Sequence, residues 1–315
     1  MKVSNLYDIL VKCDHKVSTD TRKIIKGSIF FALKGENFDG NNFALIALKN
    51  GASYSIVDNK NISKSDDRII LVKDVLETLQ NLSKYNRTKS SCYVIGLTGS
   101  NGKTTTKELI HHVLKINYKT ICTKGNYNNH IGVPLSLLKI KSSTEYAIIE
   151  MGANNFGEIK FLTELVQPDI GYITNFGLAH LEGFKNLKGV IRGKTELYHW
   201  LIKNDKQILI NNDDDEQRNF INDKAVLFGK DKNSHYQFEQ NKSNRVSLKI
   251  NDLIIETQLY GSYNFSNVCA AITLGLENKI ELRKISKSLK NYSSENNRSQ
   301  IISKNNSEII MDAYN

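Results

Sequence analysis

Cysteine is sparse in this chain of 315 residues, and the four that occur are scattered at Cys13, Cys92, Cys122 and Cys269. This spacing predicts neither a disulfide framework nor a zinc site, which suits a reducing cytoplasm. The chain also lacks an apolar run of about 18 residues and an N-terminal basic-then-apolar signal, so neither membrane insertion nor secretion is expected. We therefore expect a cytoplasmic protein.

Blocks of basic residues interleaved with aromatic residues are missing as well, although the formal net charge is +10. Such blocks are typical of proteins that bind nucleic acid. The lysines are instead spread along the chain among asparagines. No nucleic-acid partner is expected, and the charge favours a general attraction for small anionic substrates.

Length and composition describe a soluble globular protein of about two domains. In the N-terminal part, the residue pattern predicts short strands at 28–33 and 54–57 with a helix at 42–50 between them. A polar stretch at 83–91 is interpreted as a linker. We place a domain boundary there, so that the first domain covers residues 1–88.

Apolar runs typical of strands alternate with helix-like segments after this boundary. Three near-continuous runs, as strands buried on both faces require, lie at 146–149, 170–173 and 207–210. This alternation predicts an α/β domain with a mostly parallel sheet flanked by helices.

The C-terminal third contains a different pattern. Residues 246–250 and 253–256 flank an Asn-Asp turn, which predicts an antiparallel hairpin at the edge of the parallel sheet. A polar stretch at 291–299 is interpreted as a second linker. Only two short strand-like runs follow it, too few to bury a core of their own. Either they dock on the central domain, or they begin a further domain that this sequence does not contain.

The sequence Gly-Ser-Asn-Gly-Lys-Thr at 99–104 follows an apolar run at 93–97 and precedes a helix-like run at 108–114. Strand, glycine-rich turn and helix, in this order, are what a phosphate-binding loop needs, because backbone N–H groups and the helix N-terminus both face the phosphates. Lys103 would reach the outer phosphates, and the Thr104 hydroxyl would ligate Mg²⁺. The chain is therefore expected to bind a nucleoside triphosphate.

The spacing of this loop departs from the usual Gly-x-x-x-x-Gly-Lys pattern. The first glycine of that pattern would fall at Leu97, whereas Gly96 and Gly99 lie on either side of it. The alternative is a Gly-Lys-Thr turn without function, which occurs by chance in many chains. The strand before the turn and the helix after it favour nucleotide binding.

Two polar side chains after predicted strands are candidates for holding a metal ion. Glu150 directly follows the run at 146–149, and His180 comes a few residues after the run at 170–173. Because ligands collect at the carboxyl edge of a parallel sheet, we expect both side chains to project toward the phosphate loop. The alternative for each is an ordinary solvated or structural polar residue.

Four motifs together resemble the Mur ligases. They are Gly-Ser-Asn-Gly-Lys-Thr-Thr at 99–105, Gly-Asn-Tyr-Asn-Asn-His-Ile-Gly-Val-Pro-Leu at 125–135, Glu-Met-Gly-Ala-Asn at 150–154 and Ala-His-Leu-Glu-Gly-Phe at 179–184. The resemblance extends from Val17 to the end of the chain. The Asn-Asn-His-Ile-Gly-Val-Pro-Leu run is most similar to the family members that add D-alanyl-D-alanine to UDP-N-acetylmuramoyl-tripeptide in peptidoglycan precursor synthesis.

The resemblance implies an ATP-dependent amide-bond ligase that works through an acyl phosphate, with ATP and Mg²⁺ as cofactors. The catalytic residues that it implies are Lys103, Glu150, His180, Lys194 and Arg298. Among them Lys103 would hold the β and γ phosphates, Arg298 would approach the transferred phosphate, and Thr104 would join Glu150, His180 and Lys194 around the metal. Lys194 would carry a carbamate, which turns a cation into a metal-ligating anion. The alternative for Lys194 is an ordinary surface lysine on a helix.

The family also implies a set of nucleotide-binding residues: Gly99, Ser100, Asn101, Gly102, Lys103, Thr104, Thr105, Asn264, Asn267, Arg298 and Asp312. Two positions depart from the family pattern. Tyr263 stands where histidine is common, and Ser294 stands where a proline is usual. Asn264 and Asn267 are therefore stronger candidates than the ring of Tyr263.

The implied partners are UDP-N-acetylmuramoyl-tripeptide and D-alanyl-D-alanine, and the protein is expected to act as a monomer. The substrate-binding residues are Thr21, Arg22, Asn37, Asn128 and Asn129, of which Thr21 and Asn37 would hydrogen-bond the uracil edge. The expected architecture is α/β throughout. A small UDP-substrate-binding domain at 1–88 precedes a central ATP-binding P-loop domain at 89–293, and residues 294–315 form a linker and the start of a C-terminal domain.

The sequence stops where Asp312-Ala313-Tyr314-Asn315 matches the opening of that C-terminal domain, which closes over ATP in the family. Because closure excludes water from the acyl phosphate, we expect this polypeptide to bind the UDP-sugar peptide but to turn over poorly or not at all. Two alternatives stay open. One is another Mur-type or folylpolyglutamate-like ligase, which would lack the run at 128–135. The other is a fragment that binds UDP-sugar and ATP without ligating.

Overall fold

The computed structural model describes residues 1–178, 181–293, 300–304 and 307–311. The chain divides into two compact units. The first unit contains residues 1–92 and 127–144, and the second contains residues 93–126 and the described residues from 145 onward. The chain therefore enters the second unit, returns to the first and leaves it again, whereas the sequence analysis predicts one continuous segment at 89–293. The functional domain limits stay a prediction.

A four-stranded parallel sheet lies at the centre of the first unit. Its strand order is β1 (Val17–Ser18), β2 (Ile29–Phe31), β5 (Tyr54–Val57) and β6 (Ile69–Leu71). Alternate residues of these strands enter two separate cores, as the two faces of a sheet require. One core includes α1 (Val3–Lys12), α3 (Val75–Lys89) and α5 (Gly132–Leu137), and the other includes α2 (Ala44–Lys49). The strands predicted around Ile29–Phe31 and Tyr54–Val57 are confirmed.

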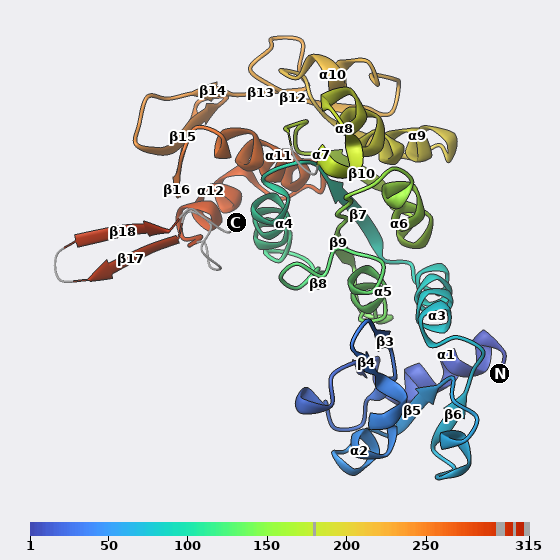
Figure 1. The fold of residues 1–315 in the computed structure, drawn as a ribbon. Coiled ribbons are helices and arrows are strands. Elements are labelled where there is room, and N and C mark those ends of the chain that lie inside the picture. Colours follow the sequence, from blue (N-terminus) through green and yellow to red (C-terminus); the bar gives the residue numbers. More distant parts are fainter. Residues whose placement is uncertain (179–180, 294–299, 305–306, 312–315) are drawn as a thin grey trace. The chain divides into compact units, whose positions relative to one another are not determined.

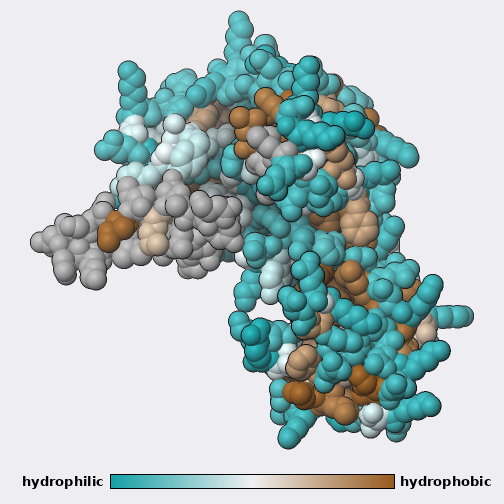
Figure 2. All heavy atoms as spheres, in the orientation of Figure 1, coloured by the Kyte–Doolittle hydropathy of each residue, from teal (hydrophilic) through white to brown (hydrophobic). Residues whose placement is uncertain are grey.

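Short elements connect these strands and helices. They are η1 (Thr21–Lys23), η2 (Gly40–Phe43), η3 (Ile62–Lys64) and the hairpin of β3 (Lys34–Gly35) and β4 (Phe38–Asp39). The predicted helix at 42–50 is thus η2 followed by α2. Leu45 and Ile46 on α2 are exposed, and Figure 2 shows hydrophobic residues gathered over this helix.

The polar stretch at 83–91 is not a linker, because residues up to Lys89 form the second half of α3. The helix begins at an Asp74 cap, whose carboxylate accepts a hydrogen bond from the Glu77 N–H. The polar residues of the stretch serve the interior: the buried Asn86 Nδ2 donates to the carbonyl oxygens of Leu137 at 2.9 Å and Ile140 at 3.0 Å. These bonds join α3 to the end of α5 and to the residues that follow it.

A seven-stranded sheet forms the centre of the second unit. Its order is β13 (Tyr236–Gln237), β12 (Ala225–Gly229), β11 (Gln207–Asn211), β10 (Ile170–Ile173), β7 (Tyr93–Thr98), β9 (Tyr146–Glu150) and β8 (Thr120–Cys122). Every neighbouring pair is parallel. The sequence prediction of a mostly parallel sheet is therefore confirmed, as is the α/β fold class.

Helices cover both faces of this sheet, as Figure 1 shows. On one face lie α4 (Lys103–Leu114), α11 (Asn264–Glu277) and α12 (Leu282–Lys290). On the other lie α6 (Glu158–Val166), α8 (Leu187–Lys194) and α9 (Glu196–Lys203). The short helices α7 (Leu181–Phe184) and α10 (Asp215–Arg218) lie in connections. This arrangement leaves the carboxyl edge of the sheet for the loops that follow the strands.

The predicted antiparallel hairpin is confirmed as β15 (Arg245–Ile250) and β16 (Leu253–Tyr260). It does not extend the central sheet, however, but forms a separate three-stranded sheet with β14 (Glu239–Gln240). Burial alternates along β15, so one face of the hairpin packs on the core. A further antiparallel pair consists of β17 (Gln300–Lys304) and β18 (Ser307–Met311). Among the described residues, no helix has the length and apolar character needed to span a bilayer.

Candidate functional site

The candidate phosphate loop connects the end of β7 to the start of α4. Gly99 and Gly102 have φ angles of +141° and +77°, a region that favours glycine. A Cβ at Gly99 would collide with Thr174, and one at Gly102 would lie 2.8 Å from the Asn267 Oδ1. Both glycines of the predicted loop are thus required by conformation and by close packing.

The loop is anchored to the residues that follow β10. The backbone N–H of Ser100 donates to the Asn175 carbonyl oxygen, and that of Asn101 donates to the Asn175 Oδ1, each at 3.1 Å. Asn175 Nδ2 in turn donates to the Asn101 carbonyl oxygen at 3.0 Å. Asn175 therefore fixes the middle of the loop, a role that the sequence analysis did not assign.

Lys103 lies over its own loop. Its ammonium donates to the carbonyl oxygens of Gly99 at 2.8 Å and Ser100 at 2.9 Å. These are the carbonyls of the turn that would surround a phosphate group. A bound polyphosphate would offer Lys103 stronger, charged acceptors in place of these neutral ones.

Thr104 and Glu150 meet at the carboxyl edge of the sheet, as the sequence analysis predicts for a metal-binding pair. The Thr104 Oγ1 donates to the Glu150 Oε2 at 3.0 Å, and both side chains are buried. Glu150 is the last residue of β9, and its backbone N–H donates to the Thr123 Oγ1 at 3.0 Å. Because β9 pairs directly with β7, Glu150 is adjacent to the strand that leads into the loop.

These two oxygen atoms fit a magnesium ion. Mg²⁺ prefers hard oxygen ligands at about 2.1 Å in octahedral geometry, which places adjacent ligands about 3 Å apart, and it completes its shell with water and phosphate. Within the described ranges there is no group of three or more His, Cys, Asp or Glu side chains able to hold a metal ion by themselves. Thr104 and Glu150 alone would therefore leave most of the coordination shell to other ligands.

Lys194 is fully buried at the end of α8, which rules out an ordinary surface lysine. Its Nζ donates to the Ala153 carbonyl oxygen at 3.3 Å and lies 5.4 Å from the centre of the Phe184 ring. Burial, and secondarily the positive charge of Lys103, lower the pKa of Lys194 to about 7, although Glu158 and Glu196 oppose the shift. A large fraction of Lys194 is therefore the neutral amine near neutral pH.

Asn264 and Asn267 are buried, and their side chains bind protein groups. The Asn267 Oδ1 accepts from the Thr106 Oγ1 at 2.9 Å, and its Nδ2 donates to the Asn264 Oδ1 at 2.9 Å. Together with the close approach of Asn267 to Gly102, these bonds connect α11 to the loop and to α4. Tyr263, in contrast, is 57% exposed, and Thr105 is buried on α4.

The residues predicted to bind UDP all lie in the first unit. Arg22 is exposed, and its guanidinium forms a bidentate ion pair with the Asp20 carboxylate at 2.7 Å. This pair, with the backbone N–H of Arg22, holds the pKa of Asp20 at about 2. The Thr21 carbonyl oxygen accepts from Asn50 at 3.0 Å, and Asn37 is exposed in the turn between β3 and β4.

Asn128 and Asn129 belong to the segment that returns to the first unit. The Asn129 Oδ1 accepts from the backbone N–H groups of Ile131 at 3.1 Å and Gly132 at 2.9 Å, so it fixes the start of α5. A Cβ at Gly132 would lie 2.5 Å from the backbone of Tyr127. In the Asn-Asn-His-Ile-Gly run, Asn129 is therefore needed at the start of α5, and Gly132 is needed because no side chain fits against Tyr127. Three predicted site residues, His180, Arg298 and Asp312, lie outside the described residues.

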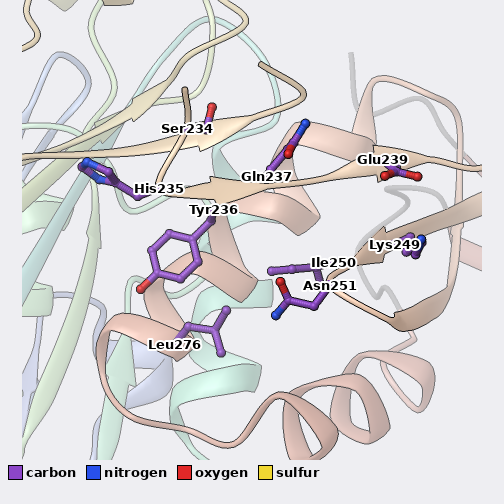
Figure 3. Close-up of a pocket in the computed structure, with 9 residues that line it drawn as sticks. All are labelled: Ser234, His235, Tyr236, Gln237, Glu239, Lys249, Ile250, Asn251 and Leu276. Carbon is purple, nitrogen blue, oxygen red and sulfur yellow. The ribbon is translucent and has the colours of Figure 1, made fainter. Parts of the chain in front are cut away.

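A cavity of about 530 Å³ lies elsewhere in the second unit, between β13, the β15 end and α11. In Figure 3 its polar side chains do not converge, because His235 and Glu239 lie at opposite ends. Ile250 and Leu276 lie between them. This cavity therefore offers no arrangement that competes with the loop as the candidate site.

Two further residues were not predicted from the sequence. Lys107 is fully buried one turn after Lys103, with its Nζ 3.5 Å from the Glu150 Oε2. Its position three residues after Thr104 places both on one face of α4, a signal that the helical period makes readable. The second residue is Glu158, whose charge opposes the lowering of the Lys194 pKa and whose carboxylate accepts from the Asn154 N–H at 2.8 Å. No sequence pattern predicts this role.

Residues 97–275 match the Mur ligase middle domain, and this segment is more than half of the chain. The chain belongs to the Mur ligase family. Residues 15–87 of this Mur ligase family member match the segment described as the catalytic domain of the Mur ligase family. The resemblance stated from the motifs is therefore confirmed.

Relatives with curated names are similar over most of the chain. The UDP-N-acetylmuramoyl-tripeptide–D-alanyl-D-alanine ligase of Haemophilus influenzae is 38% identical over 272 residues, which are 83% of this chain and 59% of the relative. The ligase of the same name from Bacillus subtilis is 34% identical over 307 residues, 96% of this chain and 67% of the relative. This Mur ligase family member thus spans roughly three fifths to two thirds of their length.

Solved structures show the same fold. MurF from Acinetobacter baumannii has a TM-score of 0.81 and 30% identity, with 95% of this chain and 68% of that one covered. A MurF ligase from Thermotoga maritima in complex with ADP has a TM-score of 0.81 and 26% identity, with 100% and 73% covered. The family fold therefore extends through both units.

Proposed function

We propose that this family member takes part in the ATP-dependent ligation of D-alanyl-D-alanine to UDP-N-acetylmuramoyl-tripeptide in peptidoglycan precursor synthesis. The observation that carries the proposal is the phosphate loop whose Thr104 hydroxyl binds the buried Glu150 carboxylate at the carboxyl edge of the sheet. The names of the curated relatives support the choice of substrates.

ATP is the proposed nucleotide, and the relative solved with ADP supports this choice. The loop N–H groups and the α4 N-terminus would bind the phosphates, and Lys103 would exchange its carbonyl acceptors for the β and γ phosphates. Thr104 and Glu150 would hold Mg²⁺, with His180 proposed as a third ligand. The ion would supply charge neutralisation on the transferred phosphoryl group. Asn264 and Asn267 would contribute by shaping the loop, and Arg298 and Asp312 stay proposals from the family pattern.

The proposed chemistry has two steps. A carboxylate oxygen of the tripeptide attacks the γ-phosphorus of ATP, and the bond from this phosphorus to the β-γ bridging oxygen breaks. The products of this step are ADP and an acyl phosphate of the tripeptide. The amine of D-alanyl-D-alanine then attacks the acyl carbon, expels inorganic phosphate and loses one proton as the amide forms. Lys103 stabilises the negative charge that develops during the first step.

We further propose that Lys194 carries a carbamate. Its neutral amine, favoured by the pKa of about 7, is the form that adds to carbon dioxide. A bond forms between Nζ and the carbon, one nitrogen proton passes to solvent, and the product carries a negative charge. This anion would add a carboxylate-like ligand near Ala153, three residues after Glu150.

In the first unit we propose that Thr21, Arg22 and Asn37 bind the UDP part of the substrate, with Asn128 and Asn129 contributing from the returning segment. The exposure of Arg22, Asn37 and Asn129 in one compact unit supports this role. The Asn37 turn lies in a hairpin that an ion pair of Lys34 with Asp58, at 2.8 Å, holds in place.

The test is calorimetric titration with ATP and Mg²⁺, followed by product analysis with UDP-N-acetylmuramoyl-tripeptide and a panel of amine acceptors. Heat of ATP binding that disappears in Lys103→Ala, and at most slow formation of a product with D-alanyl-D-alanine, are expected. A product with a different acceptor indicates another Mur-type or folylpolyglutamate-like ligase. Binding of ATP and of UDP-N-acetylmuramoyl-tripeptide without product indicates a fragment that binds both ligands but does not ligate. The absence of heat with ATP overturns the proposed nucleotide site itself.

A further inference from the structure

Lys107 is a buried cation that the proposed chemistry does not use. It lies on α4 and is 1% exposed, although lysine is almost never fully buried unless it is paired. Its Nζ lies 3.5 Å from the Glu150 Oε2 and donates to the Gly125 carbonyl oxygen at 3.3 Å. Lys107 therefore contacts the residue that is proposed to hold the metal.

Glu150 needs a cation nearby when no metal is bound. The carboxylate is 2% exposed, and an uncompensated buried charge is strongly destabilising. The Thr104 hydroxyl supplies a hydrogen bond but no charge. The Lys107 ammonium supplies a full positive charge on the same oxygen atom.

We propose that Lys107 is a positioning residue that substitutes for the divalent cation. In the nucleotide-free protein it compensates the Glu150 carboxylate and holds it beside Thr104. When the nucleotide and its divalent cation bind, the cation takes over the larger part of this compensation. The inference rests on the proposed nucleotide site and deepens it, because it assigns how that site is maintained while it is empty.

Thermodynamic linkage gives this proposal a direction. Removal of the Lys107 charge should destabilise the free protein more than the cation-bound protein, since the free protein has no divalent cation to share the compensation of Glu150. Any ligand that restores the lost interaction must then bind the variant more tightly than it binds the wild type. Two other roles for Lys107 predict different results: a phosphate-binding lysine would weaken binding when removed, and a packing residue would leave the affinity unchanged.

The experiment compares Lys107→Met, the double variant Lys107→Met/Glu150→Gln and the control Lys115→Met. Lys115 is an exposed lysine on the cap of the same helix, so its removal changes the net charge equally. Thermal unfolding is measured in a chelator without nucleotide, and then in a Mg²⁺ titration at saturating ADP. The titration midpoint and the unfolding temperature are the readouts, and neither needs turnover.

We expect Lys107→Met to lower the unfolding temperature in chelator and to lower the Mg²⁺ midpoint by roughly tenfold, within the usual range of coupling between sites. The double variant should unfold at a higher temperature than Lys107→Met alone, because the Glu150→Gln change removes the buried negative charge that Lys107 faces. Its Mg²⁺ midpoint should also no longer lie below that of the wild type. Lys115→Met should behave like the wild type in both measurements.

An unchanged or raised Mg²⁺ midpoint in Lys107→Met overturns the proposal, as does a double variant less stable than Lys107→Met. If Lys107→Met alone does not fold, the comparison of the double variant with Glu150→Gln still decides, because the proposal requires that loss of Lys107 costs little stability once Glu150 carries no charge. Failure of the proposed function is distinguishable. The wild type would then show no ADP-dependent shift at all, while the comparison in chelator would still report on the pair of Lys107 and Glu150.

Discussion

The two units hold their candidate ligand-binding side chains in different ways. In the second unit, Lys107 and Lys194 are each 1% exposed, and Glu150 is 2% exposed. In the first unit, the Arg22 side chain is 85% exposed and pairs with a residue two positions away. The difference teaches that the candidate phosphate site is already arranged by its own interior, whereas the candidate UDP site consists of surface turns whose side chains have local partners.

This contrast has an energetic consequence for ligand binding. A side chain held by buried neighbours loses little conformational freedom when a ligand arrives, whereas a flexible surface side chain loses more. Substitutions in the second unit should therefore change both stability and nucleotide affinity. Substitutions at the exposed Arg22 and Asn37 of the first unit should change affinity with little effect on stability.

The largest expected effect is that of Lys103→Met on nucleotide binding. Loss of the charged hydrogen bonds to the β and γ phosphates should weaken ATP affinity by about 100-fold, since hydrogen bonds to charged groups are the strong ones. Calorimetry with ATP and Mg²⁺ measures this loss. The affinity for the UDP-sugar peptide should stay unchanged. A parallel loss of both affinities would contradict the assignment of the two ligands to residues of different units.

The next effect is a pH dependence of stability that belongs to Lys194. Its pKa is about 7 in the folded protein and 10.5 in the unfolded chain, so the unfolded chain binds more protons between these values. The free energy of unfolding should therefore rise with pH above 7, by up to about 1.4 kcal/mol per pH unit, and should not depend on this group below 7. Denaturation of wild type and Lys194→Met from pH 6 to about pH 9, without bicarbonate, isolates the term. Parallel curves for the two proteins would rule out a neutral buried lysine.

A smaller effect concerns how Asn267 acts. If it shapes the loop through Thr106, then Asn267→Ala and Thr106→Val should weaken ATP and inorganic tripolyphosphate alike, by about tenfold, and Thr106→Ser should restore affinity. Direct contact with the adenine base would instead weaken ATP and leave tripolyphosphate unaffected. Competition titrations with the two ligands distinguish these outcomes.

The smallest effect on stability is expected for Arg22→Ala. Its ion pair with Asp20 is exposed at the surface, and such pairs stabilise proteins little. The unfolding temperature should stay the same, while the affinity for UDP falls severalfold if the guanidinium binds the ligand. A clear drop in the unfolding temperature would show that this turn is as tightly constrained as the phosphate loop.

Strands and the parallel sheet of the second unit were predictable because their apolar runs are nearly continuous, as in Tyr93–Thr98 and Ile170–Ile173. The interpretation of 83–91 as a linker was wrong, because polarity alone was taken as a linker signal. Asn86 is buried and bonded to carbonyls of residues more than 50 positions away, and no local pattern reports such a partner. The return of residues 127–144 to the first unit was missed for the same reason.

In the candidate site, the motif predicted that Thr104 and Glu150 would meet, because both lie where strands and loops reach one edge. The burial of Lys194 and the anchoring of the loop by Asn175 were not predictable from one sequence, since both depend on contacts between distant segments. The position of Lys107 was readable from the helical period, but its partner was not.

The double passage of the chain between the units bears on the order of events during synthesis. The first unit needs Leu135 and Leu138 for its core, and Asn86 needs two carbonyls from the same segment. A ribosome delivers these residues only after it has already made β7, α4 and β8 of the second unit. The N-terminal 92 residues are therefore an incomplete folding unit, and this unit can complete its core only after residues 127–144 have also been made.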